Sequence, residues 1–144
     1  MSLKPLTFAA LCAISIQAAT TNNIGAIAYI ESGNRMHAVG TKGERTAWQI
    51  MPTTWNQYTR PCESLKMASR ADAYVVASRI YAHNYVRFVK AHNKFPSHTD
   101  VYAMWNLGFA GYKRRGFNID RCPAITRRAA AKYMTICANF YSEN

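Results

Sequence analysis

Acidic residues are scarce in this sequence: seven Asp and Glu stand against eighteen Lys and Arg, which gives a formal net charge of +11. Charged residues of both signs make up 17% of the chain and hydrophobic residues 49%, so a chain that stays disordered is excluded. The imbalance points to an anionic environment, either nucleic acid, an acidic membrane surface or an anionic cell wall. A basic surface that contacts only solvent is the simplest alternative.

Long apolar runs are also missing. The longest one, residues 6–16 within MSLKPLTFAALCAISIQAAT, is too short to span a bilayer comfortably. A lysine precedes it and small residues follow it, which is the layout of a secretory signal peptide cut near Ala18 or Ala19. We therefore predict a signal peptide at 1–19, a mature domain at 20–144, and export to the periplasm or the cell exterior. An N-terminal core helix and an uncleaved membrane anchor are the alternatives.

Cysteine is limited to four residues, and removal of the signal peptide takes Cys12 with it. The three that remain allow at most one internal bridge. Cys62 and Cys122 both lie beside proline in turn-like contexts, so we predict that these two pair. Cys137 falls on an apolar helical stripe, which predicts a buried small hydrophobic residue. No Cys/His spacing is typical of a zinc site, and we expect neither a metal nor a cofactor.

Alternating strand patterns, internal repeats and linkers are absent from the sequence, and the periodicity is helical throughout. In the longest periodic segment, aromatic and apolar residues recur at spacings of three and four, and Val75 and Val86 widen the stripe. The pattern predicts one compact, mainly α domain, with room for a small hairpin at 38–46. The expected helices cover residues 21–32, 52–59, 69–93, 100–108 and 125–140.

Glu31 closes an apolar run, IAYIE, just before Ser-Gly-Asn, which is typical of a helix end. Ile24 and Ile27 lie on the same helical face as Glu31, so the carboxyl continues a buried stripe. Burial and the negative end of the helix dipole both disfavour the carboxylate and raise its pKa. Such a carboxyl suits a general acid, although a surface glutamate at a frayed helix end has the same local pattern.

Two motifs extend this interpretation. ESGNRMHAVGTKGERTAWQIMPTTW resembles the signature of the lytic transglycosylase SLT family, which has a lysozyme-like fold: Glu-Ser, then Ala-Val-Gly, then Gln-Ile-x-Pro-x-Thr-Trp. The second family motif, roughly Ala-x-x-Tyr-Asn-x-Gly, resembles the stretch AMWNLG, with Asn106-Leu107-Gly108 as its core. The sequence departs from the family at Trp105, where a Tyr is usual, and an indole cannot replace a hydroxyl. Tyr102 and Tyr112 are the candidates to supply that hydroxyl.

The resemblance implies a substrate and a reaction. The substrate is the β-1,4 bond between N-acetylmuramic acid and N-acetylglucosamine in peptidoglycan, and Glu31 is the single catalytic acid/base. It protonates the glycosidic oxygen and then deprotonates the muramyl 6-hydroxyl, which closes a 1,6-anhydro ring. Ser32 is expected to orient Glu31. The resemblance and its neighbourhood indicate these substrate-binding residues: Ser32, Trp48, Gln49, Tyr102, Trp105 and Asn106.

Other functions remain compatible with the sequence. A hydrolytic lysozyme would need a second carboxylate, for which Glu44 is the best candidate. A protein that binds the cell wall without cleaving it is a further alternative. A basic nucleic-acid binder is disfavoured, because the aromatic residues follow core stripes and no nucleic-acid motif occurs. We expect a monomer that contacts peptidoglycan strands and the anionic envelope; wall remodelling, a secretion or conjugation machine and a phage assembly all fit.

Overall fold

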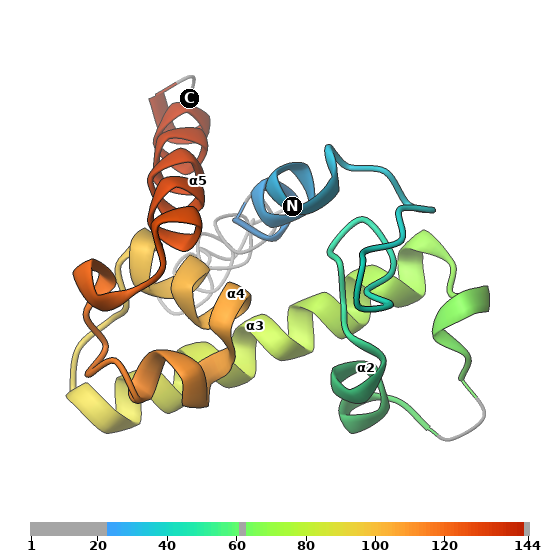
Figure 1. The fold of residues 1–144 in the computed structure, drawn as a ribbon, viewed down its shortest axis with the longest axis horizontal. Helices are drawn as coiled ribbons and strands as arrows, with labels where there is room; N and C mark the ends of the chain where they lie inside the picture. Colours follow the sequence, from blue (N-terminus) through green and yellow to red (C-terminus); the bar gives the residue numbers. More distant parts are fainter. Residues whose placement is uncertain (1–22, 61–62, 143–144) are drawn as a thin grey trace, which may run out of the picture.

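The structure is a computed structural model that describes residues 23–60 and 63–142, and it is mainly helical (Figure 1). This confirms the predicted single, mainly α domain. The predicted signal peptide lies outside the described residues, and none of the helices within them is long and apolar enough to cross a membrane. In chain order the elements are a helix over residues 23–32, called here the Glu31 helix, then α2 (Pro52–Tyr58), the 3₁₀ helix η1 (Leu65–Met67), α3 (Arg70–His92), α4 (His98–Lys113), the 3₁₀ helix η2 (Ile119–Arg121) and α5 (Ala124–Ser142).

Local sequence signals set most helix ends. Ser69 and Ser97 each begin a helix through a capping box, in which the serine and an aspartate three residues later bond reciprocally. Asn93 ends α3 in a left-handed conformation, with φ at 51°. The predicted C-terminal end of the Glu31 helix and both predicted ends of α2 and α3 are confirmed to within one residue, whereas α4 and α5 are longer than predicted. The predicted start of the Glu31 helix at residue 21 lies outside the described residues.

A kink explains the unexpected length of α4. Gly108, where the predicted helix ended, has φ 69° and ψ 157°, and the chain then resumes a helical path to Lys113. This region of the backbone map is essentially restricted to glycine. The kink therefore places Trp105 and Asn106 in the last turn before the break, at the end of a helical segment.

The helices pack around one main core, to which the Glu31 helix contributes Ile24, Ile27 and Ala28 at 0% exposure. α3 crosses the molecule: α4 packs on it near one end and α2 near the other, and α5 packs on α4 (Figure 1). A second, smaller cluster lies between α3, α4 and Cys122. The prediction that Val75 and Val86 widen the buried stripe of α3 was wrong, because they are 45% and 48% exposed.

The segment between the Glu31 helix and α2 is a folded-back loop. The predicted hairpin at 38–46 is reduced to an isolated antiparallel bridge between Val39 and Arg45, and Arg45 also bridges to Ile50. Cys122 and Cys137 are both buried free thiols, and Cys62, the predicted partner of Cys122, lies outside the described residues. The burial of Cys137 agrees with its prediction.

Candidate functional site

Glu31 lies in the last turn of its helix, half-buried, beside the fully buried residues of the same stripe. Gly33 and Asn34 follow in left-handed conformations, with φ 64° and 66°. Their N–H groups donate back to the carbonyls of Tyr29 and Ala28, at 2.8 and 3.0 Å. The helix therefore ends directly after Ser32, and Glu31 lies at the C-terminal end of the helix.

A polar cleft of about 220 Å³ opens in front of Glu31. Its walls come from segments far apart in the sequence: the loop supplies Glu44 and Gln49, and α4 supplies Trp105 and Asn106. The cleft is further lined by four residues that were not predicted as site residues: Ile50, Met51, Thr54 and Ile80. Thr54 belongs to the PTTW stretch of the first motif, and Ile80 continues the apolar stripe of α3, so the sequence held a weak signal for both.

Tyr102 supplies the hydroxyl that the sequence left unassigned. Its O–H donates to Glu31 Oε1 at 2.9 Å, across 71 positions of the sequence. Tyr112, the other candidate, instead donates to Asp100 Oδ1 at 2.6 Å. Because Tyr102 is buried at 2% exposure, this hydroxyl has a fixed position and orients the carboxyl from behind.

The environment raises the pKa of Glu31 above its ordinary value. Desolvation by burial is the largest cause, the hydrogen bond from Tyr102 works in the opposite direction, and the nearby charge of Glu44 raises the pKa further. The pKa of the Tyr102 hydroxyl is also raised, first by burial and then by the Glu31 charge, so Tyr102 remains a proton donor in the hydrogen bond. The expectation of a high-pKa carboxyl at position 31 agrees with this geometry.

Replacing Tyr102 by phenylalanine tests the role of that hydrogen bond. The bond favours the carboxylate, so its loss raises the pKa of Glu31 further. If Glu31 acts as an acid, the alkaline limb of kcat/KM moves to higher pH, and activity at the optimum falls about tenfold because the carboxyl is no longer oriented. If the substrate is the cell-wall glycan that the family resemblance implies, a pH profile on isolated glycan measures both effects; a limb that moved to lower pH would contradict this account.

The loop presents two polar side chains at the cleft. Gln49 has a positive φ of 50°, and its amide Nε2 donates to the carbonyls of Thr46 and Ala38 at 2.9 and 3.2 Å. Glu44 Oε2 accepts from the backbone N–H of Lys42 at 2.8 Å. A Cβ on Gly40 would approach Glu44 Oε2 to 2.3 Å and Gln49 Oε1 to 2.8 Å, so the glycine leaves the space that both side chains occupy.

Asn106 is held in place from α5. The hydroxyl of Thr126, a residue 1% exposed, donates to Asn106 Oδ1 at 2.8 Å. Asn106 is exposed and lines the cleft, and because its oxygen accepts from Thr126, its N–H₂ group remains as a hydrogen-bond donor. Trp105 beside it is partly exposed, so its ring is available as one wall.

The structure places two predicted site residues elsewhere. The hydroxyl of Ser32 donates to the carbonyl of Ala47 at 2.8 Å and accepts from the N–H of Arg35 at 3.0 Å, so it fastens the loop to the helix end. Among the described residues, the hydroxyl of Ser32 bonds only to backbone groups, and Tyr102 has the orienting role predicted for Ser32. Trp48 is 3% exposed and donates from Nε1 to the carbonyl of Ile24 at 2.9 Å, so it lies in the core and not in the Glu31 cleft.

Comparisons of the chain with protein-family models, with curated proteins and with solved structures return no match. The functional interpretation therefore depends on the residues and their geometry. Glu31, Gln49, Trp105 and Asn106 line one cleft together with Glu44, and Tyr102 contacts Glu31 from the core. Ser32 and Trp48 do not line this cleft.

Proposed function

We propose that this protein is a peptidoglycan lytic transglycosylase, a lyase with a lysozyme-like fold that uses Glu31 as its single general acid and base. The observation that carries the proposal is a half-buried carboxyl with a raised pKa, bonded to a buried tyrosine and facing a polar cleft with two positioned amides. A carboxyl whose pKa is raised keeps its proton to higher pH than an ordinary glutamic acid and can donate that proton to the oxygen of a glycosidic bond.

The geometry suggests which oxygen carries the proton. Tyr102 donates to Oε1, so Oε2 of Glu31 is the atom that holds and transfers it. Proton transfer to the glycosidic oxygen releases the leaving sugar as the C1–O bond breaks. The resulting carboxylate then takes the proton of the muramyl 6-hydroxyl, whose oxygen bonds to C1 and closes the anhydro ring. Because the nucleophile belongs to the same sugar, no second carboxylate or positioned water is required.

The amide groups suit the acetamido and hydroxyl groups of amino sugars. Nε2 of Gln49 is bonded to the loop backbone, which leaves its oxygen as an acceptor, whereas Asn106 offers a donor. The partly exposed ring of Trp105 can pack on the apolar face of a sugar. Donor, acceptor and aromatic wall together fit a neutral polysaccharide better than a phosphate backbone, which disfavours nucleic acid as a partner.

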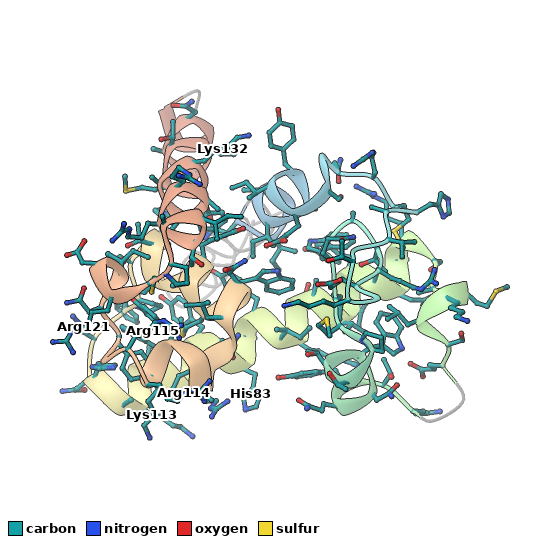
Figure 2. All side chains as sticks on the ribbon, in the orientation of Figure 1. His83, Lys113, Arg114, Arg115, Arg121 and Lys132 are labelled. Atoms are coloured by element: carbon teal, nitrogen blue, oxygen red, sulfur yellow. The ribbon has the colours of Figure 1, made fainter. Side chains whose placement is uncertain are left out.

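The surface charge suits an anionic envelope. Figure 2 shows Lys113, Arg114, Arg115 and Arg121 gathered where α4 leads into η2, with Lys132 apart on α5. Such charges would concentrate a monomeric, exported protein on the wall and would act less at high salt. A cell-wall, secretion, conjugation or phage context is compatible with this surface.

The experiment that tests the proposal is digestion of purified peptidoglycan followed by mass analysis of the sugar ends. A transglycosylase produces 1,6-anhydromuramic ends. These ends are lighter than hydrolysed ends by the mass of one water molecule, because no water is added to the broken bond. Reducing ends would replace this proposal by a hydrolase, and an intact wall would favour the non-catalytic alternative.

The position of Glu44 favours hydrolysis as the second candidate. Its carboxylate lines the same cleft and is close enough to raise the pKa of Glu31. Ordinary glycosidases use two such groups, one as acid and one as nucleophile or base. Unlike Glu31, however, Glu44 is bonded to a backbone N–H of its own loop, a structural use that needs no catalysis.

Replacing Glu44 by glutamine separates the two candidates. For a transglycosylase, we expect most activity to remain and the alkaline limb of the pH profile to move to lower pH, because the charge that raises the pKa of Glu31 is removed. For a hydrolase that depends on Glu44, activity falls by roughly 10²-fold or more. The pH dependence of sugar release from wall material distinguishes these results.

A further inference from the structure

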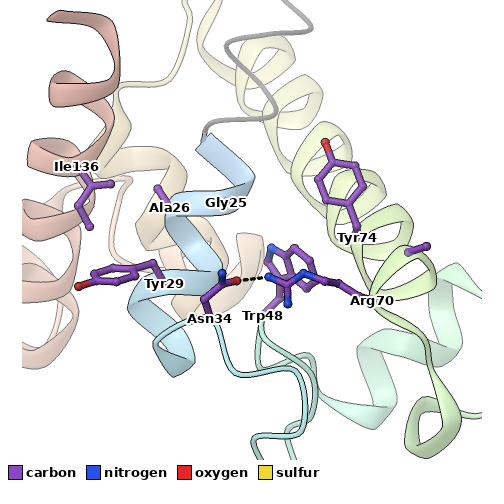
Figure 3. Close-up of a pocket in the computed structure, with 9 residues that line it drawn as sticks. Gly25, Ala26, Tyr29, Asn34, Trp48, Arg70, Tyr74 and Ile136 are labelled. Atoms are coloured by element: carbon purple, nitrogen blue, oxygen red, sulfur yellow. Dashed lines mark hydrogen bonds between the residues drawn. The ribbon is translucent and has the colours of Figure 1, made fainter. Parts of the chain in front are cut away.

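A second, larger cavity lies on the other side of the Glu31 helix from the catalytic cleft, and no step of the proposed reaction uses it. Its volume is about 890 Å³, and its lining comes from the Glu31 helix, the start of α3, the loop and α5 (Figure 3). Only Trp48 links it to the earlier site prediction. We call this cavity the Trp48 groove. Its volume is within the range of pockets that hold small organic molecules.

The floor and walls of the Trp48 groove are mostly apolar. Gly25 and Ala26 are small residues and leave space along the Glu31 helix. Tyr29 points toward Ile136 of α5, and the indole of Trp48 lies at the base of the groove (Figure 3). Tyr29 is 54% exposed, although it is a large ring on a helix that otherwise buries its apolar residues. An aliphatic chain laid along this surface would remove that area from water.

Cations flank the apolar surface. The guanidinium of Arg70 lies over the Trp48 ring, 5.5 Å from its centroid, and also bonds to Asn34 Oδ1 through Nη2. The ammonium of Lys132 lies 5.4 Å from the centroid of the Tyr29 ring. Among the described residues that line the groove none is acidic, and the nearby Asp72 lines a different pocket, next to Tyr58 and Arg79.

The placement of Arg70 is unfavourable for folding. It is the first residue of α3, a helix of 23 residues, where the positive end of the helix dipole repels a cation. The contacts with Asn34 and Trp48 hold it there. Within residues 23–60 and 63–142 the other N–H groups of its guanidinium have no hydrogen-bond acceptor, so they can bind an anion. A fixed guanidinium above an aromatic base is suited to bidentate recognition of a carboxylate or phosphate.

We propose that the Trp48 groove binds an anionic amphiphile that carries a carboxylate head group and a single aliphatic chain. The head binds Arg70 above Trp48, and the chain runs past Gly25 and over Tyr29 and Ile136. A second copy of this chain fits less well, since it would bring another strongly basic surface to Arg70 and Lys132. This site is independent of the proposed glycan cleavage, because the Glu31 cleft and the groove share no lining residue.

The test is calorimetric titration of the full chain with dodecanoate below its micelle concentration, with dodecyltrimethylammonium as the probe of opposite charge. We expect saturable binding of dodecanoate that weakens with salt, and no binding of the cation. Glu31→Gln should bind dodecanoate like the parent chain, so a failed cleavage assay and a failed binding assay are distinguishable. Failure of the parent chain to bind dodecanoate, or equal binding of both probes, would overturn the proposal.

Two variants locate the site. A Cβ on Gly25 meets no atom within 4 Å, so Gly25→Leu fills the groove in a helix that gains a better helix former, and it should abolish binding without lowering the melting temperature. Arg70→Met keeps the stem and should weaken binding roughly tenfold. Arg114→Met, at the end of α4, is the matched control and should bind normally.

Three results would assign the surface to something else and overturn the proposal. The first is dodecanoate binding that is unchanged in both Gly25→Leu and Arg70→Met. The second is binding confined to anionic vesicles and insensitive to these changes, which would indicate a general charge effect. The third is a dimer in sedimentation that Gly25→Leu dissociates while dodecanoate has no effect.

Discussion

Glu31→Gln is expected to lower the rate of glycan cleavage by about 10²- to 10⁴-fold, which is the usual contribution of a general acid. Glutamine keeps the shape of the side chain and can still accept the hydrogen bond from Tyr102, so only the transferable proton is lost. Release of muropeptides from purified wall measures the effect, with Glu63→Gln as a matched change at an exposed position outside the cleft. Equal rates for Glu31→Gln and the parent chain would remove Glu31 from the mechanism.

Glu31→Gln should also become more stable relative to the parent chain as pH rises. The folded-state pKa of Glu31 is raised above its value of 4.5, so the folded state binds the proton more tightly than the unfolded state does. The stability that this provides is fully present below pH 4.5 and is lost as pH rises through the raised folded pKa. We expect the free energy of unfolding of Glu31→Gln, relative to the parent chain, to increase between pH 4 and pH 8. Urea unfolding at both pH values measures this difference, and an opposite trend would mean that the Glu31 carboxylate is stabilised by the fold.

Gly108→Ala is expected to lower the free energy of unfolding by about 1–3 kcal/mol, because its φ of 69° and ψ of 157° are strained for any residue with a Cβ. No atom lies within 4 Å of where that Cβ would be, so the cost comes from the backbone and not from a steric clash. Chemical denaturation measures the free energy of unfolding.

Gly25→Ala provides the control for this change. It also adds a Cβ in open space, but on a regular helix, so it should be neutral or stabilising. If Gly108→Ala proved equally neutral, the kink in α4 would not be a strained feature. If α4 instead straightens to relieve the strain, Asn106 and Trp105 shift and KM for glycan rises, which steady-state kinetics on soluble fragments would show.

The positions of Ser32 and Trp48 show that residues next to each other in a motif can have side chains in different sites. Ser32 follows Glu31 directly, but successive residues of a helix point about 100° apart, so its hydroxyl faces the loop backbone while Glu31 faces the cleft. Trp48 precedes Gln49, which has a positive φ, and the chain there directs one side chain into the core and the next into the cleft. Ser32 and Trp48 therefore belong to the same motif as Glu31 and Gln49, but they do not line the Glu31 cleft.

The partner of Glu31 shows the opposite case. Tyr102 falls within the predicted helix at 100–108 and Tyr112 lies just beyond it, but nothing local shows which of the two hydroxyls reaches Glu31. Packing of α4 against the Glu31 helix decides that Tyr102 reaches Oε1, and the kink at Gly108 places Tyr112 against Asp100. A pairing across 71 positions depends on the summed geometry of every element between them, which no periodicity contains.

The sequence by itself determined the helical class, both ends of α3, the stop after Ser32 and the high-pKa character of a carboxyl on an apolar stripe. These are local properties, set by spacing, backbone preference and side-chain hydrogen bonds within a few residues. Only the tertiary structure decided that Glu44 shares the cleft with Glu31, that Thr126 orients Asn106, and that Trp48 lies beneath Arg70 in a separate groove. These contacts are between segments that are far apart in the sequence and that meet because the core packs them together. Local sequence patterns do not encode how packed helices are placed relative to one another.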